Sequence, residues 1–102
     1  MKPIGFIDPD ANWELIPEHC HDALEGYVLY GRNVGDFLTA VLSNDLRGSV
    51  DRADHINQHA LPRYVQFLYN YAPANCWGSP QNYRDWLQRG FEAREIAAGE
   101  SK

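Results

Sequence analysis

An all-α fold, a compact bundle of four or five helices with an extended N-terminal arm, is predicted for this chain of 102 residues. Apolar residues recur at three- and four-residue spacing through most of the sequence, and no stretch alternates as a half-buried strand does. The length suits one hydrophobic core. The aromatic content of 13% indicates that rings fill much of that core.

The first third of the chain predicts an arm followed by two helices. Residues 1–16 contain two prolines and a glycine before position 10 and are expected to form the extended arm. The first helix is predicted to begin at Pro17 and to end at Gly31, because proline suits a first helical position and glycine a helix end. A second helix is expected from about Asp36 to Asp45. Its apolar face is broad enough to be covered on more than one side and consists of Phe37, Leu38, Val41, Leu42 and Leu46.

The middle of the chain predicts one long helical stretch. A break is expected at residues 47–49, where the sequence is Arg-Gly-Ser. The helical pattern then runs from Asp51 to about Tyr71 and is ended by Pro73. Pro62 lies inside this pattern. Because an internal proline removes a helical hydrogen bond, either the helix kinks there or a new helix begins there.

The last helix has the best-defined start. Ser79 can cap it and Pro80 suits its first position. Trp77, just before this start, is expected to wedge the helix against the bundle. The helical domain is predicted to end at Gly90, and the tail beyond it has helical composition at first and then frays by Gly99. The predicted organisation is therefore an arm (1–16), a helical domain (17–90) and a frayed C-terminal tail (91–102).

Composition excludes several classes of protein. A formal charge of -5 argues against binding along a nucleic-acid backbone, which needs a basic stripe. No stretch approaches the ~20 apolar residues of a membrane span, so no membrane partner is expected. The N-terminus lacks the apolar run of a secretory signal, which favours the cytoplasm of a bacterial cell. In that setting Cys20 and Cys76 are expected to be reduced, buried thiols.

Candidate catalytic and metal-binding patterns are weak. His55 and His59 have a spacing that could bind one metal ion, with Asp51 one turn earlier, but the glutamate of the metalloprotease helix motif is missing between them. A solvated polar face is therefore favoured. A zinc site built from Cys20, Cys76 and a histidine lacks the usual short cysteine spacing. No cofactor and no metal are expected, and a small metal-dependent enzyme is the least favoured alternative.

A set of polar residues is the better place to look for activity. Several lie at helix ends or on faces that should be apolar, where an unpaired polar group is costly. The favoured interpretation is a buried hydrogen-bond network that locks the second helix against the third. The alternative is a pocket in which an arginine and amides hold a planar or anionic ligand beneath an aromatic ring. The candidate residues are Asn44, Asp45, Arg47, Asp54, Asn57, Tyr69, Asn70 and Trp77.

Several segments of the chain resemble a group of small uncharacterised proteins from phages and prophages. The segments are FLTAVLSNDL (37–46), Arg52-Ala53-Asp54 with Asn57, Phe67-Leu68-Tyr69-Asn70, Ala72-Pro73 and Cys76-Trp77-Gly78-Ser79-Pro80. The likeness covers roughly residues 16–87. It implies a bacterial-cytoplasm setting and a non-structural accessory role, and it assigns no catalytic or binding residues.

These expectations favour a non-enzymatic phage or prophage accessory protein that binds its target stoichiometrically. The leading hypothesis is that it blocks a bacterial host protein or an anti-phage defence protein, with Trp13, Tyr30 or Trp86 as an exposed anchor. The alternative is a sponge for a small nucleotide immune signal, which would use Arg47 or Arg63, nearby amides and ring stacking. Self-association into a homo-oligomer is compatible with so many aromatic residues in a short chain.

Overall fold

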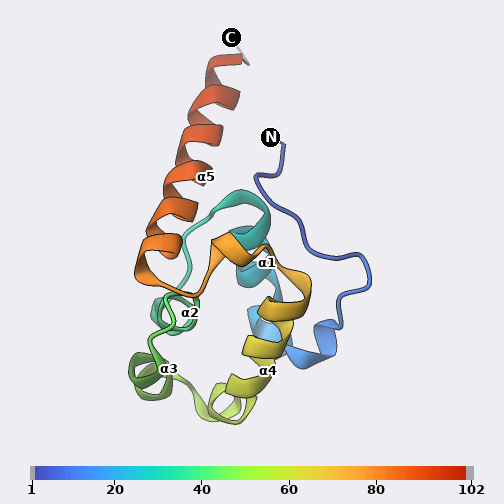
Figure 1. Cartoon of the computed structure of the whole chain (residues 1–102), viewed down its shortest axis with the longest axis vertical. Coiled ribbons are helices and arrows are strands. Elements are labelled where there is room, and N and C mark those ends of the chain that lie inside the picture. The colour runs from blue at the N-terminus through green and yellow to red at the C-terminus, as the bar shows by residue number, and fades with distance from the viewer. Residues whose placement is uncertain (1, 101–102) are drawn as a thin grey trace.

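A computed structural model describes residues 2–100 and confirms the all-α bundle (Figure 1). No strand occurs between residues 2 and 100. The α-helices are α1 (His21–Tyr30), α2 (Asp36–Leu42), α3 (Leu46–Arg52), α4 (His55–Tyr71) and α5 (Pro80–Glu100). Three short 3-10 helices, η1 (Trp13–Leu15), η2 (Glu18–Cys20) and η3 (Ala74–Cys76), lie between or before them.

The core lies where α1, α2, α4 and the first half of α5 meet. Each helix contributes apolar residues at three- and four-residue spacing, which places them on one face. Burying a large apolar side chain stabilises the fold by about 1.5–3 kcal/mol, so these residues supply most of the driving force. The largest fully buried side chains are Trp86, Tyr27, Tyr64, Phe67, Leu24, Leu42, Leu68, Val28 and Cys76.

The N-terminal arm is attached to the bundle by its backbone. Ile4 donates its N–H to the carbonyl of Leu29 (2.7 Å), and Asp8 donates to that of Tyr71 (3.0 Å). The arm therefore bridges the end of α1 and the end of α4. It is extended at first and then contains the single turn η1.

The predicted first helix ends where expected. Gly31 has a left-handed backbone (φ 65°) and donates its N–H to the carbonyl of Tyr27 (2.8 Å), which is a glycine helix end. At the other end the chain forms η2 immediately after Pro17 and only then becomes α-helical at His21.

The boundary between the second and third helices was predicted wrongly. The chain leaves α2 at Leu42, and Asn44 takes a left-handed backbone conformation (φ 61°), which asparagine tolerates better than most residues. Asp45 then caps α3 by accepting the N–H of Gly48 (2.9 Å). The break therefore lies at residues 43–45, and the segment 47–49 is helical.

The long fourth helix begins later than Asp51. α3 ends at Arg52, and Asp54 caps α4 by accepting the N–H of Asn57 (2.7 Å). No new helix begins at Pro62, because α4 runs through this residue without interruption. Pro62 is exposed, where the backbone hydrogen bond it cannot make is least costly.

The start of the last helix is confirmed, and its predicted end is wrong. Ser79 accepts the N–H of Asn82 (3.1 Å), as an N-cap should. The helix passes through Gly90 to Glu100, so the described part of the expected tail is helical; residues 101 and 102 lie outside the described residues. Gly90 serves close packing instead, since a Cβ atom built on it would lie 2.7 Å from the Cα of Gly31.

Candidate functional site

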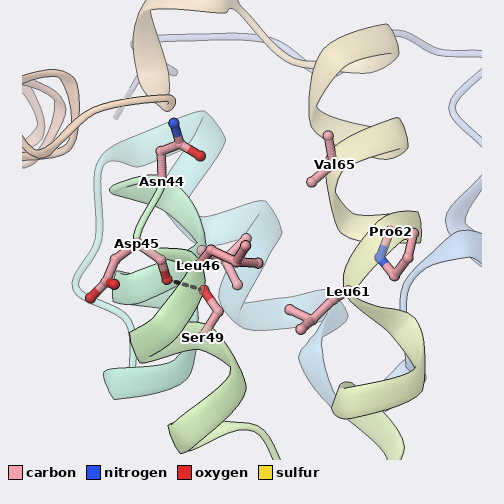
Figure 2. A pocket seen from close by; sticks show the side chains of 8 residues that line it. Asn44, Asp45, Leu46, Ser49, Leu61, Pro62 and Val65 are labelled. Atoms are coloured by element: carbon pink, nitrogen blue, oxygen red, sulfur yellow. Dashed lines mark hydrogen bonds between the residues drawn. The ribbon is translucent and has the colours of Figure 1, made fainter.

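A groove between α3 and α4 is the candidate site, called the α3–α4 groove below (Figure 2). Its volume is about 200 Å³. Figure 2 shows Leu46 on α3 and Leu61 on α4 pointing toward one another across it. The lining residues are Val41, Asn44, Asp45, Leu46, Ser49, Leu61, Pro62 and Val65. Most of them are apolar, and the groove therefore suits an apolar ligand surface.

The edges of the α3–α4 groove expose large apolar side chains. Leu46 is 73% exposed and Val65 is 51% exposed. One helical turn further along their helices, Val50 is 46% exposed and Tyr69 is 79% exposed. Single exposed apolar residues are common on proteins, but a group of them around a hollow marks an interaction surface.

The corner between α2 and α3 fixes the position of Leu46. Asn44 donates its N–H to Val41 (3.1 Å), and Asp45 donates its N–H to Ala40 (2.8 Å). The carbonyl of Asp45 also accepts the hydroxyl of Ser49 (2.7 Å), as Figure 2 shows. Leu46 follows this corner directly, so its side chain is presented to the groove by a hydrogen-bonded backbone.

Asp54 and Asn57 belong to a different structure, a hydrogen-bonded series that we call the buried polar chain. Its inner members Cys20, Asn57 and Tyr64 are buried, and Asp54 and His19 form its exposed outer end. Asn57 is 4% exposed, and its side-chain oxygen accepts the hydroxyl of Tyr64 (2.8 Å). Its amide nitrogen lies 3.8 Å from the sulfur of Cys20. Asp54, which caps α4, lies 3.0 Å from the Nε2 of His19. The buried polar chain thus joins η2 to α4, whereas the expected network joined the second and third helices.

The protonation states in the buried polar chain follow from its surroundings. The backbone N–H of Asn57, and to a lesser extent His19, lower the pKa of Asp54 below its usual value. Burial raises the pKa of Tyr64 above its usual value. At neutral pH the cap is therefore a carboxylate, and Tyr64 is a neutral phenol whose hydroxyl donates a hydrogen bond to the side-chain oxygen of Asn57.

The remaining candidates neither line the α3–α4 groove nor belong to the buried polar chain, and Tyr69 lies one helical turn beyond the groove lining. Arg47 is exposed on α3, and Tyr69 is exposed on α4. Asn70 is also exposed, and its side chain donates to the carbonyl of Gln66 (2.8 Å). Trp77 is partly buried against the core, and its carbonyl accepts the side-chain amide of Asn82 (2.9 Å). Because Asn57 is enclosed while Arg47 and Asn70 face solvent, these three do not converge on one ligand.

The histidines and cysteines are placed in separate environments. The rings of His55 and His59 contact each other edge-on, with centroids 5.4 Å apart. Cys20 and Cys76 are free and buried, and burial raises the pKa of Cys76 to about 12. No group of three or more histidine, cysteine or acidic side chains in the described part of the chain is placed to hold a metal ion.

The three aromatic residues expected as surface anchors are buried or partly buried. Trp86 is only 2% exposed and donates its indole N–H to the carbonyl of Tyr27 (2.8 Å), so it belongs to the core. Trp13 and Tyr30 are partly buried, and Trp13 packs on Phe67 with ring centroids 4.6 Å apart. The exposed aromatic side chains are those of Phe6, Tyr69 and Phe91 instead, while the exposed apolar residues that line the groove, Leu46 and Val65, are aliphatic. The sequence signal that could have found the groove is the four-residue spacing of Leu61 and Val65. These two residues form a second apolar stripe on α4 beside the stripe that faces the core.

Within residues 2–100, no helix has both the length and the apolar character that crossing a membrane requires. The chain matches no protein-family model, no curated protein and no solved structure.

Proposed function

We propose that this protein acts by stoichiometric binding of another protein, and that the α3–α4 groove receives an apolar face of that partner. The observation that carries the proposal is the exposure of Leu46 (73%) and Val65 (51%) on either side of an apolar hollow. A groove between two helices accepts an amphipathic helix, whose apolar residues recur every three or four positions. Covering these side chains supplies binding energy at roughly 25 cal/mol per Å² of apolar surface.

Charge is expected to affect the rate at which the partner associates more than the affinity of the complex. Residues 45–66 contain three aspartates and three arginines, so the groove region is close to neutral. The whole chain has a formal charge of -5. A partner with a basic surface would therefore associate faster at low salt, while the apolar contact would determine how long the complex lasts.

The proposed role is to block a bacterial host protein or an anti-phage defence protein. The resemblance to phage and prophage accessory proteins is the basis for this setting. The thiol of Cys76 and the phenol of Tyr64 are kept protonated by burial, so neither is a ready nucleophile at neutral pH. Binding requires no such group, only a surface of the right shape.

The test is capture of the partner by matched surface variants. Tagged wild-type protein, the double variant Leu46→Ser/Val65→Ser and the control Ile96→Ser are each incubated with lysate of a phage-sensitive bacterium, and bound proteins are quantified. Ile96 is 63% exposed on α5, far along the chain from the groove. The same partner should be recovered with the wild type and the control and should be lost with the double variant.

Two results would count against this function. Recovery of the same partner by the double variant would show that the α3–α4 groove is not the contact. A rise in melting temperature with cyclic dinucleotides or ADP-ribose derivatives, without any protein captured, would favour the nucleotide sponge.

A further inference from the structure

The second half of α5 is less covered by the rest of the molecule than the first half, which carries the buried Trp86. Figure 1 shows this part of the helix projecting beyond the bundle. Phe91 is 53% exposed and Ile96 is 63% exposed there. Most of the stability of a helix in a protein comes from packing of one of its faces, and a short unsupported segment is marginal in water. A surface that covers this segment would therefore stabilise it.

Four exposed residues of α5 form one stripe. Arg84, Gln88, Phe91 and Glu95 are spaced by four, three and four residues, which is the spacing of a coiled-coil seam. The stripe carries a positive charge at its beginning, a negative charge at its end and an aromatic ring between them. In its own chain Arg84 contacts the neutral amide of Gln81 (3.3 Å).

A shallow hollow lies beside this stripe. Its volume is about 280 Å³. It lies between α5 and the loop that follows α1, and Arg94 is held beside it by donating to the carbonyl of Tyr30 (3.0 Å). The lining residues are Gly31, Asn33, Arg84, Leu87, Gln88, Phe91 and Arg94.

We propose that two copies of the chain pair through α5 in antiparallel orientation, about a twofold axis that crosses the helix midway between Gln88 and Phe91. Arg84 lies as far before this axis as Glu95 lies after it. The axis therefore places Arg84 of one copy opposite Glu95 of the second copy, and symmetry forms this pair twice. The same axis brings Phe91 of each copy level with Gln88 of the other, in the middle of the hollow.

Charge complementarity selects a second copy as the occupant. Arg84 and Glu95 are eleven residues apart, about 16 Å along one helix, so they cannot pair within a chain. Antiparallel pairing gives each of them a partner of opposite sign. It also lays the supported first half of one α5 against the projecting second half of the other, which is the segment that needs covering.

The test is a charge-reversal series on the full chain, measured by sedimentation velocity over a range of protein concentrations. Wild-type protein should form a dimer as concentration rises. Arg84→Glu places two glutamates opposite each other, and Glu95→Arg places two arginines opposite each other. Each should weaken dimerisation about tenfold. The double variant Arg84→Glu/Glu95→Arg restores opposite charges across the axis and should dimerise like the wild type.

The control is Arg63→Glu, which makes the same charge change on the exposed surface of α4 and should leave dimerisation unchanged. Hydrogen exchange of residues 92–99 should slow with concentration in the wild type and the double variant, and stay fast in the single variants. A monomer at every concentration would overturn the proposal. So would a double variant as weak as the single ones, or an equal effect of Arg63→Glu.

Discussion

The two sides of α4 reverse the usual placement of polar and apolar residues. On the side that faces η2, Asn57 and Tyr64 are buried polar side chains that bond to each other. On the side that faces α3, Leu61 and Val65 are apolar side chains that line an open hollow. Buried polar residues and groups of uncovered apolar residues around a hollow are both uncommon, and each needs its own explanation.

The residues on the two sides of α4 differ in what they contribute to stability. Every buried side-chain nitrogen and oxygen in the described part of the chain has a hydrogen-bond partner. The buried polar chain therefore contributes to folding and leaves no group free for a ligand. The α3–α4 groove has the opposite property, because its apolar residues gain little from folding and would gain from binding. The comparison predicts that substitutions on the first side change stability and substitutions on the second side change binding.

The largest effect is expected for Asn57→Ala. It removes the acceptor of the Tyr64 hydroxyl and leaves that hydroxyl unpaired in the core. The free energy of unfolding should fall by about 3 kcal/mol, measured by urea denaturation. Asn70→Ala is the matched control, because Asn70 is an exposed asparagine on the same helix; it should change stability by about 0.5 kcal/mol at most. Equal losses in the two variants would contradict a special role for the buried polar chain.

A smaller loss of stability is expected for Tyr64→Phe. The ring stays in the core, and only the hydroxyl that donates to Asn57 is removed. The amide oxygen of Asn57 keeps the thiol of Cys20 within 4.0 Å as a weak donor. The free energy of unfolding should therefore fall by about 1 kcal/mol. In the double variant Asn57→Ala/Tyr64→Phe the loss should be well below the sum of the single losses, because both remove the same bond. Additive losses would show that the bond does not contribute.

A pH-dependent effect is expected from the cap of α4. The pKa of Asp54 is lower in the folded chain than its usual value near 4, so its carboxylate stabilises the fold above that pH. This stability should be lost as the pH falls through the lowered pKa. The melting temperature of Asp54→Ala should thus lie below that of the wild type at pH 7, and the gap should narrow in acid below about pH 4. A gap that stays constant with pH would contradict the charged cap.

Local sequence signals predicted some helix ends and missed others for a physical reason. The end at Gly31 and the start at Ser79 depend on residues next to each other in the chain, and both were predicted. Gly90 looks like a helix end by composition. It lies inside α5 instead, where the end of α1 packs so closely that a Cβ atom has no room, and that approach is a tertiary contact.

The candidate site was only partly predictable for a related reason. Asn44 and Asp45 were identified from their polarity and do lie at the α3–α4 groove. Leu46 was assigned to the core face of the second helix, because the helix break was placed after it. Moving that break to residues 43–45 turns Leu46 into the first residue of α3 and exposes it. An error of a few residues in one boundary therefore hid the apolar side of the site.

The smallest change in stability is expected for Leu46→Ser, although it lies closest to the proposed function. The side chain is 73% exposed, so the folded chain loses little buried apolar surface, and the free energy of unfolding should change by about 0.5 kcal/mol or less. Leu42→Ser, four residues earlier and fully buried, is the matched control and should cost about 3 kcal/mol or more. Urea denaturation measures both variants, and capture of the partner measures Leu46→Ser. If Leu46→Ser destabilised the chain as much as Leu42→Ser does, Leu46 would belong to the core and the α3–α4 groove would not be an open surface. A stable variant that no longer captures its partner would assign Leu46 to binding.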